Sequence, residues 1–419
     1  MKIYILSFFF TCAVGAQNLS IEDLWNQQQQ LSSSKEQEAL FDLGTLKIKT
    51  EKGRRLPVIT GEANLQRNLI VPVTPVPSIA FDPTAQAGDI TPLKFATDWS
   101  AKAGIQLAWD LFNPNTQLAI ETAKLEQKGD QLQSNLDAED LKKNATKAYG
   151  KALLAQKQYD AAVQDTILYH KIVEVSKLRF TAGRIGILEH NRAVQTQMQK
   201  QNQWVEAYQV YVNSLMELGR YHNLENVVQL SSSMEEIVAA LQFGETNFKE
   251  EKIENERNKI VMQRQNLTKE LLPTLTFNAY YGAQYFDNSL AVFSGDQWFG
   301  SSYVNLGLKL PISNTFQYQL KTKRFKKQEE IYSYQLEEEQ KKNRIDKAQK
   351  EQKITALKQK WELSREMDKL ASSSVETAQK QFDEGRILIQ QLNEEVSNSW
   401  SMNKQTWQIM YDCLEAVLD

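Results

Sequence analysis

Residues 272–285 read Leu-Pro-Thr-Leu-Thr-Phe-Asn-Ala-Tyr-Tyr-Gly-Ala-Gln-Tyr. From Leu275 to Tyr285 apolar side chains recur at every second position, and mostly polar residues stand between them. A period of two predicts a β-strand with one apolar and one polar face. The strand has the length of about ten residues that a tilted strand needs to cross a bilayer. For one such strand, a soluble sheet with one wet face is the ordinary alternative.

Three further segments alternate in the same way: residues 302–310, 98–110 and, more weakly, 59–66. The aromatic residues Trp99, Trp109 and Tyr281 suit an interfacial girdle. Residues 71–92 contain five prolines and 287–300 are rich in turn residues, so each is expected to be a loop that does not continue a strand ladder. The sequence therefore predicts two β-hairpins.

The chain also repeats itself. The dipeptide at residues 56–57, Leu-Pro, returns at 272–273, and the motif Phe-x-x-Gly-Arg at 180–184 returns at 382–386. Each copy contains two alternating segments, a loop between them and then a long helical stretch that ends at the Gly-Arg pair. This common order predicts a twofold internal repeat.

The helical stretches carry a narrow seam of small residues. Alanines from Ala145 to Ala162, with Tyr159 among them, are spaced by alternating steps of four and three, and Ala371, Val375, Ala378 and Phe382 follow the same rule. Such a seam lets two helices approach closely while the Gln, Lys and Glu residues between stay solvated. We expect long antiparallel coiled helices, the first over residues 115–180, with returns beginning near 188 and 389.

Composition narrows the function. Apolar residues make up 41% of the chain, and 49 basic against 52 acidic residues give a net charge of -3. A nucleic-acid partner would need a strongly basic face, so none is expected. Three histidines and two cysteines are too few and too scattered for a zinc site or a Cys-His nucleophile, so we expect no enzyme, metal or cofactor.

The first sixteen residues predict export. Lys2 precedes an apolar run over residues 3–10, and Val14 and Ala16 fit a cleavage site after Ala16. A lipoprotein-type cleavage that lipidates Cys12 is the alternative. No later stretch has 18 consecutive apolar residues, so the chain is expected to enter a membrane only through its strands. Four strands are too few to close a barrel, which takes about eight, so several copies must share one.

The passage at residues 109–115, Trp-Asp-Leu-Phe-Asn-Pro-Asn, is similar to the strand-to-helix turn Gln-Pro-Leu-Phe-Asp-Gly-Gly of the TolC-type outer-membrane efflux channels. With the Leu-Pro strand starts and the paired Gly-Arg tips, the chain resembles this family over nearly its whole length. The resemblance implies a mostly α-helical homotrimer. Each chain would give four strands to a shared 12-stranded barrel, and its helices would form a periplasmic tunnel.

The resemblance also implies function and sites. It implies an outer-membrane efflux duct of a Gram-negative bacterium that exports small molecules or proteins together with a periplasmic adaptor and an inner-membrane pump. The residues that it assigns to adaptor docking at the helical tips are Ala182, Gly183, Arg184, Glu384, Gly385 and Arg386. An ordinary helix C-cap is the alternative for both glycines. The periplasmic gate of the family falls on Gln391 and Glu394 in this chain. Glu189 has the equivalent position in the first copy and is expected to join the closing network, paired with Arg184 or Arg386. A solvated helix face is the alternative for a lone glutamate. Gln391 departs from the acid that the family has there.

The expected parts of the chain follow from these landmarks. They are the signal peptide 1–16, an N-terminal helical segment 17–55, the first barrel hairpin 56–112, the first helical hairpin 113–221, an equatorial mixed element 222–247, a helix 248–271, the second barrel hairpin 272–312 and the second helical hairpin 313–419. The alternative function is a periplasmic coiled-coil adaptor or structural protein without a pore, which leaves the bilayer-length strands unexplained. The sequence indicates neither the cargo nor whether the pump is driven by protons or ATP.

Overall fold

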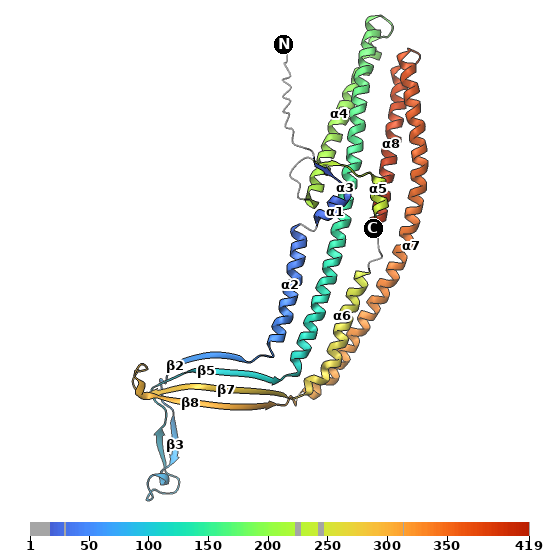
Figure 1. Cartoon of the computed structure of the whole chain (residues 1–419). Coiled ribbons are helices and arrows are strands. Elements are labelled where there is room, and N and C mark those ends of the chain that lie inside the picture. Colours follow the sequence, from blue (N-terminus) through green and yellow to red (C-terminus); the bar gives the residue numbers. More distant parts are fainter. Residues whose placement is uncertain (1–16, 29–30, 223–227, 242–246, 313, 419) are drawn as a thin grey trace. The chain divides into compact units, whose positions relative to one another are not determined.

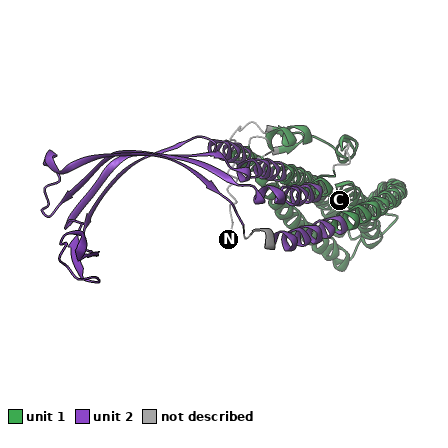
Figure 2. Ribbon diagram, turned by 90° about the horizontal axis from the view of Figure 1, so that it is seen from below, with its two compact units in different colours: residues 1–40, 131–252, 335–419 green, residues 41–130, 253–334 purple. Residues whose placement is uncertain are grey.

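The computed structural model describes residues 17–28, 31–222, 228–241, 247–312 and 314–418. The expected signal peptide and Cys12 lie outside these residues. The chain forms two compact units, one made of residues 1–40, 131–252 and 335–419 and the other of residues 41–130 and 253–334 (Figure 2). Each unit draws on both halves of the sequence, because the long helices α3 (Pro114–Thr181) and α7 (Asn314–Asp383) contribute to both.

The second unit contains one antiparallel sheet of four strands (Figure 1). In spatial order these are β2 (Val58–Arg67), β5 (Trp99–Phe112), β7 (Thr274–Asp287) and β8 (Trp298–Lys309). The strands β2 and β5 form one hairpin and β7 and β8 the other, while the β5–β7 pair joins the two repeats. The four strands agree with the four alternating segments in the sequence.

The register sorts the side chains of the sheet into rows. Ile59, Leu107, Ala279 and Val304 are mutual partners and make an apolar row across all four strands. The next row consists of Thr60, Gln106, Tyr280 and Tyr303 and is polar or phenolic. Because neighbouring residues of a strand point to opposite faces, one face of the sheet is apolar and the other polar. In the single chain the apolar face is exposed at Ile59 (64%) and Val304 (71%).

Tyr280 covers a gap in the polar face. Gly104 and Gly282 are register partners, and a Cβ atom built on Gly104 would lie 2.6 Å from the Tyr280 hydroxyl. The Tyr280 ring is 2% exposed, and its hydroxyl donates to the Ala103 carbonyl at 3.2 Å. The two glycines therefore provide the space that the tyrosine fills.

The proline-rich segment 71–92, expected as a loop, contains a two-stranded ribbon of β3 (Val73–Pro77) and β4 (Ile90–Lys94). In this detail the prediction was wrong. A two-stranded ribbon has an outer edge on each strand, and proline, which lacks a backbone donor, is tolerated there. Pro75 and Pro92 face each other across it. The second loop, before β8, holds only the short 3-10 turn η5 (Gly295–Gln297).

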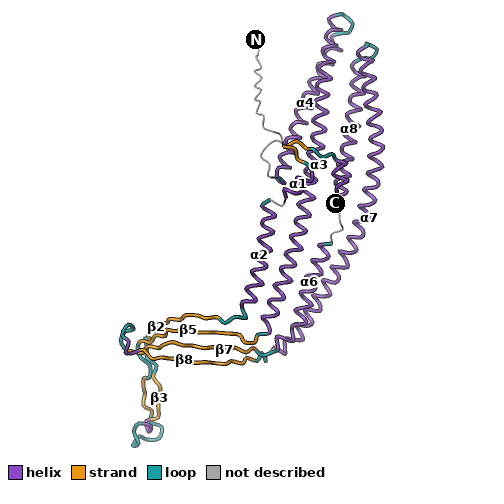
Figure 3. The backbone as a smooth tube through the Cα atoms, viewed as in Figure 1, coloured by secondary structure: helices purple, strands orange, loops and turns teal. Residues whose placement is uncertain are grey.

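The long helices form two hairpins, and their tips and return helices belong to the first unit (Figure 3). The first consists of α3 and α4 (Ile187–Leu218), and the second of α7 and α8 (Ile389–Leu418). The alanine seam is confirmed, since Ala145, Ala152 and Ala371 are all buried. Within the described ranges no helix has a stretch long and apolar enough to cross a membrane.

The shorter elements differ in part from expectation. The N-terminal helical segment expected over residues 17–55 consists of two helices, and the residues before them pair as a strand with residues 228–230. The elements are β1 (Gln17–Leu19), α1 (Ile21–Gln27), α2 (Ser32–Gly53), η2 (Ser78–Ala80), η3 (Gly219–Tyr221), β6 (Val228–Leu230), α5 (Met234–Ala240), α6 (Phe248–Gln265) and η4 (Asn266–Leu271). The strand β1 pairs in parallel with β6 in residues 222–247.

Candidate functional site

The free ends of the two helical hairpins share one backbone turn. Gly183 and Gly385 have φ angles of +70° and +78°. The amide of Arg184 donates to the Arg179 carbonyl at 2.8 Å, and the amide of Arg386 donates to the Gln381 carbonyl at 2.8 Å. These bonds define a Schellman turn, which needs the left-handed conformation that glycine adopts without strain. The C-cap alternative for both glycines therefore holds, and it leaves open what docks there.

The six predicted docking residues are all exposed on these turns. Arg386 and Glu384 form an ion pair, with Nε and Oε2 3.0 Å apart, at the second tip. Among the described residues of the single chain, no ion pair joins Glu189 to Arg184 or Arg386. The tips offer backbone and charged groups to solvent, as a docking surface requires.

Arg179 joins the two tips and was missed in the sequence. Its guanidinium, in the last turn of α3, donates to the carbonyls of Phe382 and Asp383 at the end of α7, the second at 3.0 Å. It also lies over the Phe382 ring at 4.5 Å from the centroid. The Phe382 carbonyl also accepts from the Gly385 amide at 2.9 Å. Carbonyls at a helix C-terminus have no donor from a following turn of the helix, and a cation there also interacts favourably with the helix dipole. The first hairpin thus caps the second.

Below the tips an apolar cluster combines all four helices. Tyr169 and Ile172 come from α3, Ala193 from α4, Phe382 from α7 and Leu392 from α8, and each is at most 3% exposed. The two hairpins of one chain are therefore held together by a shared core as well as by Arg179.

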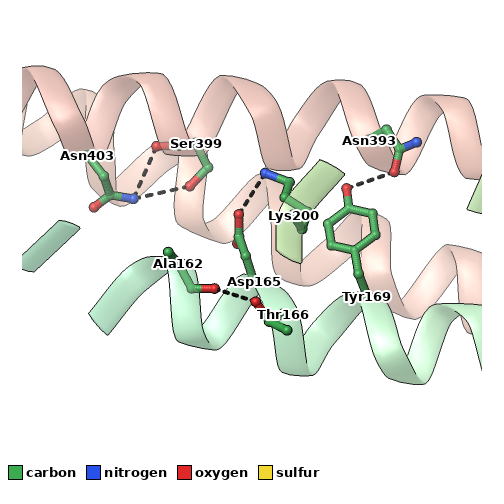
Figure 4. Close-up of polar contacts among 8 residues, drawn as sticks. All are labelled: Ala162, Asp165, Thr166, Tyr169, Lys200, Asn393, Ser399 and Asn403. Atoms are coloured by element: carbon green, nitrogen blue, oxygen red, sulfur yellow. Dashed lines mark hydrogen bonds and ion pairs between the residues drawn. The ribbon is translucent and has the colours of Figure 1, made fainter. Parts of the chain in front are cut away.

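A polar network lies beside this core (Figure 4). The Lys200 ammonium of α4 is 2.7 Å from Asp165 of α3, and their side chains are only 10% and 19% exposed. The Tyr169 hydroxyl donates to Asn393 of α8 at 2.7 Å, and the Asn393 amide donates to Thr196 of α4 at 3.3 Å. Burial, with a smaller contribution from Asp165, raises the pKa of Tyr169 well above its usual range, so it stays a hydrogen-bond donor. Polar pairing thus links three helices.

The three predicted gate residues lie in the first turns of the return helices. Gln391 accepts a hydrogen bond from the Leu388 amide at 3.1 Å, so its side chain caps α8. Glu394 is exposed and accepts a bond from Gln390 at 3.4 Å. Among the described residues, no hydrogen bond or ion pair joins Glu189 to Gln391 or Glu394. The structure of one chain does not bring the three together.

Metal ligands are sparse. Within the described parts of the chain, no three His, Cys, Asp or Glu side chains are grouped closely enough to hold a metal ion.

No protein-family model and no curated protein sequence matches this chain. Solved structures do match. The CmeC outer membrane channel of Campylobacter jejuni has a TM-score of 0.69 at 12% identity, over 95% of this chain and 84% of that chain. The outer membrane protein VceC of Vibrio cholerae has a TM-score of 0.68 at 11% identity, over 95% and 94%. The open-state MtrE outer membrane channel of Neisseria gonorrhoeae has a TM-score of 0.66 at 11% identity, over 95% and 87%.

The chain has the fold of the TolC-type outer-membrane channels. The resemblance read from its sequence is confirmed at the level of the fold. The sequence did contain a signal for Arg179. The repeats differ at this position, since Arg179 precedes Phe180 of the first motif and Gln381 precedes Phe382 of the second. Nothing in the sequence indicated that Lys200 and Asn393 meet Asp165 and Tyr169, since the pairs are 35 and 224 residues apart.

Proposed function

We propose that three copies of this chain form a duct in the outer membrane of a Gram-negative bacterium and export small molecules or proteins from the periplasm. The duct is the outer part of a tripartite pump, and it makes or breaks no bonds. The single observation that carries the proposal is the four-stranded sheet, with its apolar and polar rows and its two end strands, β2 and β8.

The end strands need partners if the sheet lies in lipid. Hydrocarbon offers no hydrogen-bond partner, and each unsatisfied backbone group costs free energy there. Pairing β8 of one copy with β2 of the next is a head-to-tail contact, which closes into a ring when the rotation fits. Three copies then give a 12-stranded barrel with its apolar rows toward lipid. Export of the chain by its N-terminal signal peptide fits this location.

The helical hairpins serve as the periplasmic tunnel wall in this proposal. The exposed turns at 182–184 and 384–386 dock the periplasmic adaptor, which links the duct to an inner-membrane pump. Glu394 and Glu189, with Gln391, surround the narrowest point when three copies meet. Adaptor contacts shift the tunnel from closed to open by binding the open state more tightly.

Extraction and electrophoresis test the proposal. We expect the protein to leave membranes only with detergent, to run as a heat-sensitive trimer, and to give discrete conductance steps in planar bilayers. A chain that stays folded and monomeric in buffer without detergent would contradict the duct and favour the adaptor alternative.

A further inference from the structure

A pocket of 470 Å³ lies where strand β5 passes into helix α3. Its lining comes from the end of β5, from the first turn of α3, and from the segments that precede β2 and β7. The volume falls within the roughly 300–1,000 Å³ of small-molecule sites. All of its residues belong to the same compact unit as the sheet.

Two cations line this pocket, Arg55 and Lys269. The Arg55 guanidinium donates to the neutral amide oxygen of Gln117, which fixes its position without neutralising its charge. In the described part of the chain neither cation forms an ion pair with a carboxylate. Asp110 also lines the pocket, and the amide of Asn113 donates to its carboxylate at 3.0 Å. One positive charge is therefore in excess.

The beginning of α3 adds to this positive character. The Asn113 side chain accepts from the Asn115 amide at 3.0 Å and so caps the helix, with Pro114 as its first residue. The N-terminus of a helix carries a partial positive charge that favours anions. A phosphate group in the pocket would meet both cations and the helix end.

The remaining wall is apolar and partly exposed. The register of β5 shifts between Asp110 and Phe112, so Leu111 has no partner on β7 and turns toward the pocket. Leu111, Phe112 and Leu272 are each more than two-fifths exposed. The indole of Trp109 donates to the Arg55 carbonyl at 2.8 Å, which holds the ring beside the cations. Cations, an aromatic ring and apolar side chains together suit the headgroup level of a bilayer.

We infer that this pocket binds the phosphate group of a membrane phospholipid, with Arg55 and Lys269 on the phosphate and Leu111, Phe112 and Leu272 against the upper acyl chains. The inference rests on the proposed function, because lipid reaches the pocket only if the sheet spans a bilayer and the strand ends lie at its periplasmic surface. Bound lipid then fixes the depth of the sheet at the junction with the helices.

The second repeat lacks this combination at the equivalent junction. Counted from the Leu-Pro pair, Leu271 takes the place of Arg55, and counted from the start of the helix, Lys309 takes the place of Trp109. One site per chain is therefore expected.

Native mass spectrometry of the detergent-purified oligomer tests the site. Phosphatidylglycerol is added to the wild type, to the variant Arg55→Gln/Lys269→Gln, and to the matched control Lys52→Gln/Arg54→Gln. The control removes two exposed cations, one in the last turn of α2 and one directly after it. We expect the wild type and the control to retain one phosphatidylglycerol per chain and the pocket variant to lose it, with unchanged circular dichroism. Diacylglycerol with the same acyl chains should not be retained by any of them.

Three results would overturn the inference. The first is that the pocket variant retains as much phosphatidylglycerol as the control, and the second is that diacylglycerol binds equally well. The third is that inorganic phosphate displaces the phospholipid completely, which would make the site one for free phosphate. A failure of the proposed function would be detected during purification, before any lipid is added, because the chain would then need no detergent and form no oligomer.

Discussion

The two helical hairpins end at Gly183 and Gly385 in turns with the same backbone hydrogen bonds, yet only the first has an arginine four residues before the glycine. Arg179 reaches across to the second hairpin, whereas its counterpart Gln381 makes no such contact to the first among the described residues. Both repeats thus have the glycine and the backbone hydrogen bonds that each tip needs for its own turn. They differ at the arginine by which the first hairpin contacts the second.

The same contrast holds elsewhere. The first strand hairpin carries the β3–β4 ribbon, while the second has a short loop with η5. Tyr149 of the first repeat binds the N-terminal strand, and residue 351, its counterpart by the tip spacing, is a glutamate. The features that the repeats share form each hairpin by itself, whereas Arg179 and Tyr149, which they do not share, contact segments outside their own hairpin.

The largest effect is expected where the repeats meet in the sheet. A Cβ atom on Gly282 would overlap the Ala103 carbonyl oxygen and the Tyr280 hydroxyl, and the first of these is backbone held in the β5–β7 pair. Gly282→Ala should destabilise the sheet by about 3 kcal/mol, the upper part of the range for overpacking. Thermal unfolding followed by circular dichroism measures it. Gly61→Ala in edge strand β2, where no atom lies within 4 Å of the added Cβ, is the control and should change little. Equal melting temperatures for both variants would contradict this close packing between β5 and β7.

Replacing Arg179 tests the asymmetry of the tips. Arg179→Ala removes the guanidinium donor from the carbonyls of Phe382 and Asp383, of which the first keeps its bond from the Gly385 amide, and should cost about 1.5 kcal/mol, as for hydrogen bonds to charged groups. Gln381→Ala, at the matching position of the second repeat, should cost almost nothing. Urea unfolding of both variants gives the comparison, and Arg179→Lys should recover only part of the loss because an ammonium cannot reproduce the fork of a guanidinium. If both alanine variants unfold alike, Arg179 does not clamp the tips.

Tyr149 tests the link that only the first repeat has. Its buried hydroxyl donates to the Leu19 carbonyl at 2.8 Å and accepts from the Ser232 amide at 3.0 Å. Tyr149→Phe should cost about 1 kcal/mol, whereas the control Tyr159→Phe, at a partly exposed position, should cost less. Burial raises the pKa of Tyr149, so the stability from this group is present below about pH 10 and lost as the pH rises further. The variant should therefore lose less stability than the wild type between neutral and strongly alkaline pH, and parallel pH profiles would refute the role.

Much of the fold follows from short-range patterns in the sequence. Period-two alternation gave all four strands of the sheet, and the alanine seam gave the buried sides of the long helices, because each pattern reflects which side chains are buried on one element. The β1–β6 pair and the β3–β4 ribbon were missed. A three-residue strand such as β1 is too short to show an alternation of apolar and polar residues. The prolines in residues 73–94 indicated a loop and so hid the ribbon.

The site was less predictable than the fold. The two tip glycines were found because the turn needs their left-handed conformation locally. Arg179, Lys200 and Asn393 act through partners in other helices, and no local pattern specifies which residues meet across a helix interface. Gln391 shows the converse, since its side chain accepts from the Leu388 amide and caps the start of α8, a contact three residues away in the sequence.

The smallest effect on stability, and the sharpest on transport, is expected at the gate positions. Glu394 is exposed, so Glu394→Ala should leave the free energy of unfolding within about 0.5 kcal/mol of wild type. If three such carboxylates ring the pore, the variant should change single-channel conductance and its block by divalent cations, because a ring of like charge sets the selectivity of a narrow pore.

Gln391→Ala should do the opposite: it removes the bond to the Leu388 amide and so costs stability, but it takes no charge from the pore. Glu189→Ala, at the position of the first repeat that matches Gln391, then decides whether the acid kept in one repeat replaces the acid lost from the other. Unchanged block by divalent cations in both glutamate variants would remove the acidic gate from the proposal and leave the tips as docking surfaces alone.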